Sequence, residues 1–395
     1  MIDVKEDFGA VGDGQTDDTE AIIDAEQSAT NEETIFFPHG DYLVTEQNNS
    51  DIALSVYNNK LIFQGEGEAT RIFGNGGSYH IFHCSNKSNI KWRDLKIDTV
   101  ANGYSGIYFE SSNYNVIEDC NIAGGNNAIT LNTACYFNRI EKSKLTSVNS
   151  DAVILTNSCK YNKILHNEIL NCGDSGIGCL TNSDWNSILD NIIHGTTGAG
   201  VCIDGSYYNA VSHNQIYNTS NSGIVFVSAE FNEAMDNIIN ECGLTGNNHG
   251  ILLQSGANSC KIGGNFIRGS SGYGIYVYNS NYVSLVDNSS YLNLYDGIKL
   301  NGADHCSVAI NKCWDNDRNN TDSYDGIRLI TSGYNDLDNN DCFTTTGSTR
   351  QRYGINIENS YSNKNKLHGN KLLSNKTGAL NDSGTNTILN DNVTQ

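Results

Sequence analysis

The chain has 395 residues, a formal net charge of -21, 17% charged residues, 39 glycines and a single proline, Pro38. Such an acidic chain lacks the basic footprint that phosphate binding needs, so we expect no nucleic-acid partner. No stretch approaches 18 consecutive apolar residues and no signal peptide follows Met1, so we expect neither a membrane span nor a leader in this chain.

The first predicted element is a helix close to the N-terminus. The segment TDDTEAIIDAEQ starts at Thr16, offers Asp17 or Asp18 as an N-cap, and places apolar residues on one helical face. That face consists of Ala21, Ile22 and Ala25. A helix here would close the open end of the repeat structure that follows.

From residue 100 onward one template recurs: a small residue, alternating apolar positions, a polar turn, and Asn before a second short strand. The intervals between the small residues run from 22 to 29 residues. Their positions are Gly106, Ala128, Ala152, Gly176, Gly200, Gly223, Gly250, Gly274, Gly297, Gly326, Gly354 and Gly378. The strands are too short for helical crossovers, so the chain must wind, with each coil pairing with the next at about 4.8 Å.

This pattern predicts an all-β fold, a single-stranded parallel β-helix of about 12 or more coils with a short N-terminal capping helix. We place the cap and first coils in residues 1–75 and one continuous domain of repeats in residues 76–395. The preference of parallel crossovers favours a right-handed coil.

A column of asparagines keeps the same period and is expected to form a ladder of amide hydrogen bonds at the turns. Its members are Asn167, Asn191, Asn214, Asn237 and Asn265. The chain's 12 cysteines also follow the repeat, as Cys135 and Cys159 show at one repeat position, and no Cys-x-x-Cys occurs. We therefore expect mostly structural thiols inside the fold.

The segments DVKEDFGAVGDGQTDDTEAI, TIFFPHGDYLV and LIFQGEGEATRIFG, within residues 2–75, resemble the start of the pectate-lyase-like right-handed parallel β-helix superfamily. That superfamily includes polygalacturonases, uronan lyases and epimerases, and phage tailspike depolymerases. The resemblance implies a protein that acts on a polysaccharide and is extracellular or on a virion or cell surface.

The reaction motifs of that superfamily match only in part. Asp151 and Asp174 come near the acids of polygalacturonases, but Ser175 replaces the second acid and Ala199 stands at the histidine position. The Asp-Pro-His motif of alginate epimerases is absent, because the one proline lies elsewhere.

Alternation along each repeat strand sends every second side chain outward and creates two outward columns. Between the third and sixth coils these columns are small or apolar, which is typical of a covered surface. We expect a loop or a homo-oligomeric contact, such as a trimer, near Ile154, Leu180, Val225 and Val227.

From the seventh to the eleventh coil the outward positions become aromatic, charged and polar. Aromatic rings stack on pyranose faces while polar groups bind hydroxyls, so this face is the candidate groove. Its substrate-binding candidates are Tyr273, Tyr278, Gln254, Asn301, Tyr353 and Glu358, and its catalytic candidates are Lys299, Arg328, Asp296, Asp325, Tyr276 and His249. The alternative is a solvated sheet face with stacked tyrosines and local ion pairs.

Two similar heptapeptides, YDGIKLN and YDGIRLI, recur 29 residues apart in this face. Within them Asp296 precedes Lys299 and Asp325 precedes Arg328, at a spacing that allows local ion pairs. Stacking of the coils would set the two cations side by side and lower the pKa of Lys299, while the two carboxylates would raise one carboxyl pKa.

These groups suit more than one reaction. In a lyase or epimerase, Arg328 would neutralise the uronate carboxylate, Lys299 would be the base, and Tyr276 or His249 the acid. In a glycoside hydrolase or tailspike-like depolymerase, Asp296 and Asp325 would flank the bond, and a separation near 5 Å would predict retention.

The cations slightly favour the lyase or epimerase reading and an anionic sugar. A non-catalytic carbohydrate-binding or surface-structural β-helix is the further alternative. No segment has the pattern of a metal-binding loop, and we expect neither a metal nor a cofactor.

Overall fold

The computed structural model describes residues 1–48, 50–99, 104–246, 248–345 and 350–394. They form two compact units, Met1–Ile193 and His194–Gln395. The boundary expected near residue 75 lies inside the first unit, so that division stays a prediction. Each unit is a parallel β-solenoid, as the repeat predicted.

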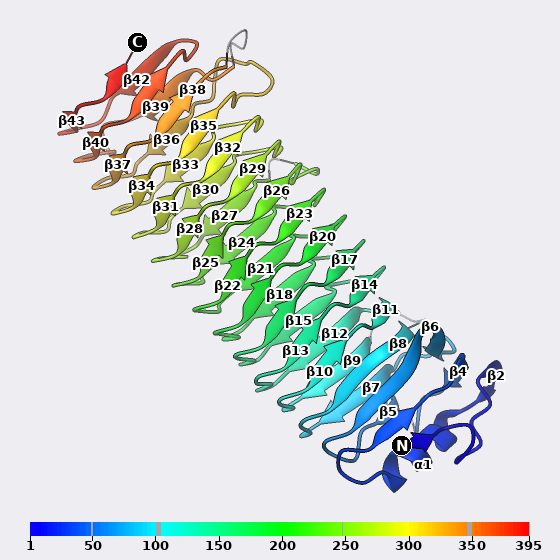
Figure 1. The fold of residues 1–395 in the computed structure, drawn as a ribbon. Helices are drawn as coiled ribbons and strands as arrows, with labels where there is room; N and C mark the ends of the chain where they lie inside the picture. The colour runs from blue at the N-terminus through cyan, green and yellow to red at the C-terminus, as the bar shows by residue number, and fades with distance from the viewer. Residues whose placement is uncertain (49, 100–103, 247, 346–349, 395) are drawn as a thin grey trace. The chain divides into compact units, whose positions relative to one another are not determined.

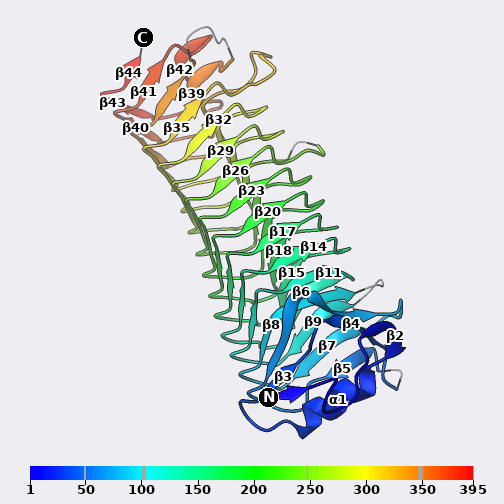
Figure 2. The same cartoon turned by 45° about the vertical axis from the view of Figure 1, so that its right-hand side comes forward.

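The first unit begins with an irregular segment around α1 (Thr19–Ser28). Its strands are β1 (Ile2–Asp3), β2 (Asp13–Asp17), β3 (Thr34–Phe36), β4 (Gly40–Val44), β6 (Ile62–Gly74) and β8 (Lys91–Thr99). The helix lies beside β5 (Ile52–Ser55) at the N-terminal end of the unit (Figure 2). Among the described residues no helix is long and apolar enough to cross a membrane.

The predicted helix forms, but its cap works differently. Asp18 occupies the N-cap position without a side-chain bond to the helix, because its carboxylate accepts the backbone N–H groups of Val11 and Gly12 at 2.6 and 3.0 Å. Ile22 is buried as expected, whereas Ala21 is only half-buried. Asp18 therefore ties the preceding loop to the helix instead of capping it.

The remaining strands of the first unit form three columns. The strands of the first column carry the outward positions that the sequence predicted. The first column contains β5, β7 (His80–Ser85), β9 (Ser105–Glu110), β12 (Asn127–Asn132), β15 (Val153–Thr156) and β18 (Ile177–Leu180). The second contains β10 (Val116–Glu118), β13 (Arg139–Glu141), β16 (Lys163–Leu165) and β19 (Ser187–Leu189). The third contains β11 (Asn121–Gly124), β14 (Lys144–Thr146), β17 (Glu168–Leu170) and β20 (Ile192–His194).

The second unit repeats the same three columns, and the strands of each column follow one another in chain order (Figure 1). The first column contains β21 (Val201–Asp204), β24 (Ile224–Val227), β27 (Ile251–Gln254), β30 (Ile275–Tyr278), β33 (Ile298–Asn301), β36 (Ile327–Ile330), β39 (Tyr353–Ile357) and β42 (Gly378–Asp382). The second contains β22 (Ala210–Ser212), β25 (Glu233–Met235), β28 (Lys261–Gly263), β31 (Ser284–Val286), β34 (Ser307–Ala309), β37 (Asp336–Asp338), β40 (Lys366–His368) and β43 (Ile388–Asn390). The third contains β23 (Gln215–Tyr217), β26 (Ile238–Asn240), β29 (Phe266–Arg268), β32 (Ser289–Tyr291), β35 (Lys312–Trp314), β38 (Asp341–Phe343), β41 (Lys371–Leu373) and β44 (Val393–Thr394).

The core of each unit is a stack of inward side chains, because alternate residues of a strand point to opposite faces. In β30 and β33, Ile275 pairs with Ile298 and Val277 with Leu300, and all four are fully buried. The residues between them point outward, as the alternation predicted. Within the expected apolar patch, Val225 is only 6% exposed, whereas Ile154, Leu180 and Val227 are half-buried.

The predicted asparagine ladder is present in both units. In the first, the Asn167 amide donates to the Asn191 side-chain oxygen at 3.0 Å. In the second, Asn237 donates to Asn265 at 3.0 Å and to the Val211 carbonyl at 2.9 Å. Each amide thus satisfies turn groups of a neighbouring coil, which explains why the residue recurs there.

The twelve cysteines, all of which lie in the described residues, form no disulfide. Eleven are buried and Cys202 is partly exposed. The expectation of structural thiols inside the fold is therefore confirmed.

Candidate functional site

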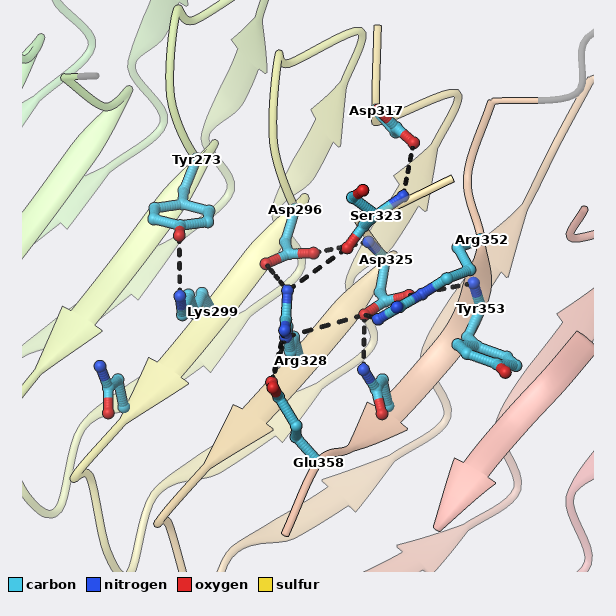
Figure 3. Close-up of polar contacts among 12 residues, drawn as sticks. Tyr273, Asp296, Lys299, Asp317, Ser323, Asp325, Arg328, Arg352, Tyr353 and Glu358 are labelled. Carbon is cyan, nitrogen blue, oxygen red and sulfur yellow. Dashed lines mark hydrogen bonds and ion pairs between the residues drawn. The ribbon is translucent and has the colours of Figure 1, made fainter. Parts of the chain in front are cut away.

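The candidate groove maps onto the outer surface of β30, β33, β36 and β39 in the second unit. The strands pair in parallel so that Tyr276 faces Lys299, Lys299 faces Arg328 and Arg328 faces Asn356. The stacking of Lys299 beside Arg328 that the two heptapeptides suggested is therefore present. Figure 3 shows Lys299 and Arg328 together with Asp296 and Asp325, the acids that precede their strands.

The two aspartates do not line an open groove. Asp296 and Asp325 stand one coil apart, linked by the Gly297 N–H bond to the Asp325 carbonyl at 3.1 Å, and both are fully buried. A buried carboxylate is costly unless hydrogen bonds or opposite charges compensate it. The partners of each acid therefore decide what it can do.

Asp325 is fully engaged. Arg352 binds it in a bidentate pair, with Nε donating to Oδ1 at 2.9 Å and Nη2 donating to Oδ2 at 2.8 Å. The Tyr353 backbone N–H donates to Oδ1 at 3.1 Å and the Asn356 amide to Oδ2 at 2.8 Å. Both oxygens are thus occupied, and the carboxylate links its own coil to the next one.

Arg352 was missed in the sequence because it lies two residues before its glycine, outside the columns considered. Asp325 is buried in the structure, and a buried acid requires a partner on a neighbouring coil. Arg352 is the basic residue adjacent to that position in the following repeat, QRYG. This basic residue was the one available signal, and it pointed to Asp325 only once the burial of that acid was known.

Asp296 is under-compensated in comparison. Its Oδ1 accepts the Asp325 backbone N–H at 2.5 Å, but its Oδ2 has no hydrogen-bond partner among the described residues. The nearest cation is Arg328, whose Nη1 lies 3.9 Å from Oδ2. Burial first, and then the charge of Asp325, raise the pKa of Asp296 to about 8. This carboxyl is therefore largely neutral at pH 7.

Arg328 joins these acids to the surface. Its Nε donates to Glu358 Oε2 at 2.6 Å, and its Nη1 approaches the Ser323 carbonyl at 3.4 Å (Figure 3). Its Nε lies 4.0 Å from Asp325 Oδ2, so the predicted pair within that heptapeptide is present but long. Glu358 is 39% exposed, whereas Arg328 is 15% exposed. The guanidinium is therefore held mainly by an acid that solvent or a ligand can reach.

Lys299 does not pair with Asp296 as its heptapeptide suggested. Its Nζ donates instead to the Tyr273 hydroxyl oxygen at 2.7 Å, and it lies 4.5 Å from the Tyr273 ring centre and 5.5 Å from that of Tyr276. Lys299 is only 9% exposed. Burial is the main cause that lowers its pKa, Asp296 opposes this shift, and the nearby Arg328 adds to it. Repulsion between the cations, which the sequence suggested as the cause, is thus secondary.

The remaining aromatic candidates surround this amine. Tyr273 and Tyr276 lie 4.9 Å apart, and His249 packs on both at 5.1 and 5.0 Å between ring centres. His249 Nδ1 accepts the Tyr273 backbone N–H at 3.2 Å, and burial lowers the pKa of His249 to about 4. The ring is therefore neutral at pH 7, with its proton on Nε2. Burial also raises the pKa values of Tyr273 and Tyr276, so both hydroxyls stay protonated.

The polar and aromatic rim is partly accessible. Tyr278 is 39% exposed and lies 5.8 Å from Tyr276 between ring centres, while the Asn301 amide donates to the Tyr276 hydroxyl oxygen at 3.1 Å. Gln254 is half-buried on the same surface. Tyr353 is separate from this cluster and lies under Arg352, whose guanidinium carbon is 5.0 Å from the ring centre.

The structure thus divides the predicted residues into two groups. In one group, the Lys299 amine and the tyrosine hydroxyls lie beside an aromatic rim. In the other, a charge network with Asp325 at its centre lies on the adjacent coils. Among the described residues no three His, Cys, Asp or Glu side chains converge in a way that could hold a metal ion. The chemistry open to this arrangement is proton transfer next to a cation.

The comparisons with known proteins concern the fold. A family profile described as the right handed beta helix region matches residues 79–239 and 230–393. No curated protein sequence matches the chain.

Similar solved structures include two A-modules of mannuronan C-5 epimerases from Azotobacter vinelandii. AlgE6 gives a TM-score of 0.51 at 19% identity, covering 100% of this chain and 99% of that chain. AlgE4 gives 0.52 at 18% identity, covering 98% and 96%. The periplasmic alginate epimerase AlgG gives 0.51 at 13% identity, covering 74% and 79%. At these identities the likeness shows a common fold, and because the family profile spans most of the sequence, the chain belongs to the right-handed β-helix family.

Proposed function

We propose that this protein modifies a uronate-containing polysaccharide by removing the proton next to the sugar carboxylate, as lyases and epimerases do. The observation that carries the proposal is Lys299. It is a nearly buried amine with a lowered pKa, 2.7 Å from a tyrosine hydroxyl, and the cation Arg328 lies on the adjacent strand. A base, an acid and a positive charge are the groups that this reaction requires.

The charges around Lys299 favour an anionic sugar despite the acidic chain. Arg328 and Arg352 are balanced by Glu358 and Asp325, while the raised pKa of Asp296 keeps its carboxyl largely neutral at pH 7. Among the described residues no acid forms an ion pair with Lys299, and its lowered pKa favours the neutral amine that a base requires. A uronate carboxylate would instead adjoin the guanidinium of Arg328.

In the elimination, Lys299 takes the proton from C5, the C5–H electron pair forms the C4–C5 double bond, and the C4–O bond breaks. The Tyr273 or Tyr276 hydroxyl donates its proton to the leaving oxygen. Base and acid project from the same sheet face, which suits elimination better than epimerisation, since epimerisation returns a proton to the opposite face of the sugar. The fold accommodates chemistry at C5, because two similar structures are named as mannuronan C-5 epimerases.

Hydrolysis by Asp296 and Asp325 has less support. A glycosidase needs two accessible carboxyl groups on either side of the bond. Both aspartates are fully buried, and the two oxygens of Asp325 are occupied by Arg352, Asn356 and a backbone N–H.

The test is to incubate the protein in D2O with polymannuronate, polyguluronate, polygalacturonate and a glucuronate-containing polymer. Elimination should produce the ultraviolet absorbance of an unsaturated uronate, and epimerisation should place deuterium at C5 in the NMR spectrum. Lys299→Met should lower either rate at least a hundredfold, consistent with the usual contribution of a general base. The matched control Lys312→Met removes an exposed lysine of β35 and should leave the rate unchanged.

Neither absorbance nor deuterium on any of the four polymers would overturn the proposal. So would equal effects of the two substitutions. New reducing ends without absorbance would instead identify a hydrolase.

We further infer an extracellular or cell-surface location from the substrate class. A homo-oligomeric contact near Ile154 and Leu180 of the first unit, or near Val225 and Val227 of the second, stays a prediction. Sedimentation as a monomer would contradict it.

A further inference from the structure

The first unit carries a second cluster of histidine and tyrosine side chains on its own first strand column. His80 and His83 lie on β7, and Tyr108 lies on the adjacent strand β9. The Tyr108 ring centre is 4.3 Å from that of His80 and 5.5 Å from that of His83. All three side chains are half-buried. The function proposed above makes no use of them.

The cluster occupies the same strand positions as the Lys299 site. Tyr108 pairs with His83 on β7, and His80 lies three residues before His83. In the same way, Tyr276 pairs with Leu252 on β27, and His249 lies three residues before Leu252. Each tyrosine also pairs with a residue on the following strand, and an asparagine lies two residues after that residue. These residues are Asn132 in the first unit and Asn301 in the second.

The hydrogen bonds also correspond. The Ser105 backbone N–H donates to His80 Nδ1 at 3.0 Å, as the Tyr273 N–H donates to His249 Nδ1 at 3.2 Å. The Asn132 amide donates to the Tyr108 hydroxyl oxygen at 2.6 Å, as Asn301 donates to Tyr276 at 3.1 Å.

The imidazole and phenol groups therefore have corresponding hydrogen-bond partners in both clusters. Burial lowers the pKa of His80 to about 4, the value also found for His249, so each ring is neutral with its proton on Nε2. In each case the ring presents an N–H donor beside a tyrosine. The main difference is the ring angle, which is 33° between His80 and Tyr108 and 81° between His249 and Tyr276.

The cluster in the first unit lacks the charged residues that correspond to Lys299 and Asp296. Thr130 pairs with Tyr108 at the position where Lys299 pairs with Tyr276. Asn127 precedes Thr130 by three residues, as Asp296 precedes Lys299. The cluster thus keeps the aromatic and amide groups of the other site and replaces its acid and its amine by neutral side chains.

One further correspondence concerns an unused polar atom. Asn127 is 8% exposed, and its Oδ1 has no hydrogen-bond partner among the described residues, like Oδ2 of Asp296. A buried acceptor without a partner is costly, so both positions carry the same kind of local strain.

Electrostatics around the cluster disfavour an anionic ligand. Glu110 lies on β9 beside the cluster and accepts the Ser85 hydroxyl at 3.1 Å. Within the described residues no Lys or Arg forms an ion pair with Glu110, and both histidines have lowered pKa values. A sugar carboxylate would therefore meet a negative charge without a compensating cation, whereas neutral hydroxyls would find acceptors and donors.

We propose that His80, His83, Tyr108 and Asn132 form a binding site for a neutral pyranose unit of a glycan, without catalytic activity. The rings of Tyr108 and His83 offer faces for the C–H surface of the sugar, and the imidazole and Glu110 offer hydrogen-bonding groups for its hydroxyls. The site is separate from Lys299 and goes beyond the proposed reaction.

The experiment measures binding of neutral hexasaccharides of glucose, mannose and galactose to the intact chain by saturation-transfer NMR and calorimetry. At least one should bind, and Tyr108→Ala and His83→Ala should each raise its Kd at least tenfold. His83→Ala serves as the second variant if Tyr108→Ala unfolds. The matched control Tyr114→Ala removes an exposed tyrosine that stacks on Phe137 at 5.1 Å, and it should leave the Kd unchanged.

Tyr276→Ala and Lys299→Met separate this inference from the proposed function. Both should retain the neutral hexasaccharide while losing activity on uronate polymers. No binding of any neutral hexasaccharide overturns the inference even if uronate turnover is present. Binding that Tyr276→Ala removes and Tyr108→Ala spares overturns it as well.

Discussion

At the scale of single residues, Asp296 combines complete burial with one oxygen that lacks a hydrogen-bond partner. Its pKa in the folded protein is raised from 3.8 to about 8, so the folded state binds a proton that the unfolded chain releases between these two values. The contribution of this proton to stability is complete below about pH 4 and is lost as the pH rises through about 8.

The substitution Asp296→Asn removes this titration and keeps the shape of the side chain. We expect the wild-type protein to lose stability relative to the variant by up to about 1.4 kcal/mol per pH unit between these limits. The measurement is the thermal unfolding midpoint of both proteins at pH 5, 7 and 9. A difference in midpoint that stays constant with pH would contradict the assignment.

Asp325 shows the opposite situation, a buried carboxylate whose charge is fully compensated. In Asp325→Asn an amide N–H faces the Arg352 guanidinium, so this half-buried cation keeps one hydrogen-bond acceptor instead of two and loses its counter-charge. We expect a loss of about 3–5 kcal/mol in the free energy of unfolding. The control Asp336→Asn breaks an ion pair with Lys366 at 3.3 Å, in which both side chains are at least half exposed, and should cost less than about 1 kcal/mol.

Urea unfolding of the two variants gives the comparison. Similar losses for both substitutions would show that Asp325 is not the buried centre of the charge network.

At the scale of elements, the small residue that begins each repeat strand is required by close approach of the chain. A Cβ on Gly274 would lie 1.9 Å from Ser290 Oγ and 2.6 Å from the Gly297 carbonyl oxygen. Backbone of the next coil and a core side chain therefore occupy the space. At Gly378, the corresponding position of β42, a Cβ would only touch the Tyr353 ring at 3.4 Å.

The substitution Gly274→Ala should therefore destabilise the second unit by about 1–3 kcal/mol, as overpacking does. Gly378→Ala is the matched control and should change the thermal unfolding midpoint little. A harmless Gly274→Ala would show that the coils can separate at this position.

At the scale of the whole molecule, the cysteines report on the integrity of the fold. Because eleven thiols are buried and Cys202 is partly exposed, a disulfide reagent should label one cysteine in the native protein and all twelve after denaturation. Cys202→Ser should abolish the native-state labelling. Rapid labelling of several further thiols under native conditions would contradict the described packing.

The sequence alone determined the repeat, the inward and outward alternation, the asparagine ladder, the structural cysteines and the neighbouring positions of Lys299 and Arg328. These features depend on a period that recurs in the chain, and a parallel solenoid converts a period into a contact between coils. The tertiary structure decided what the outward groups do. In the structure, Lys299 binds the Tyr273 hydroxyl instead of Asp296, and Arg352 pairs with Asp325. Both aspartates are buried.

The correspondence between the His80 and His249 clusters also required the structure. In the first cluster, His80 and His83 lie before the aligned repeats, and Ile81 follows His80 where Gly250 follows His249. The repeat pattern therefore did not relate these histidines to the second cluster. Burial and side-chain direction depend on the shape of several neighbouring coils at once, and a periodic pattern does not contain that information.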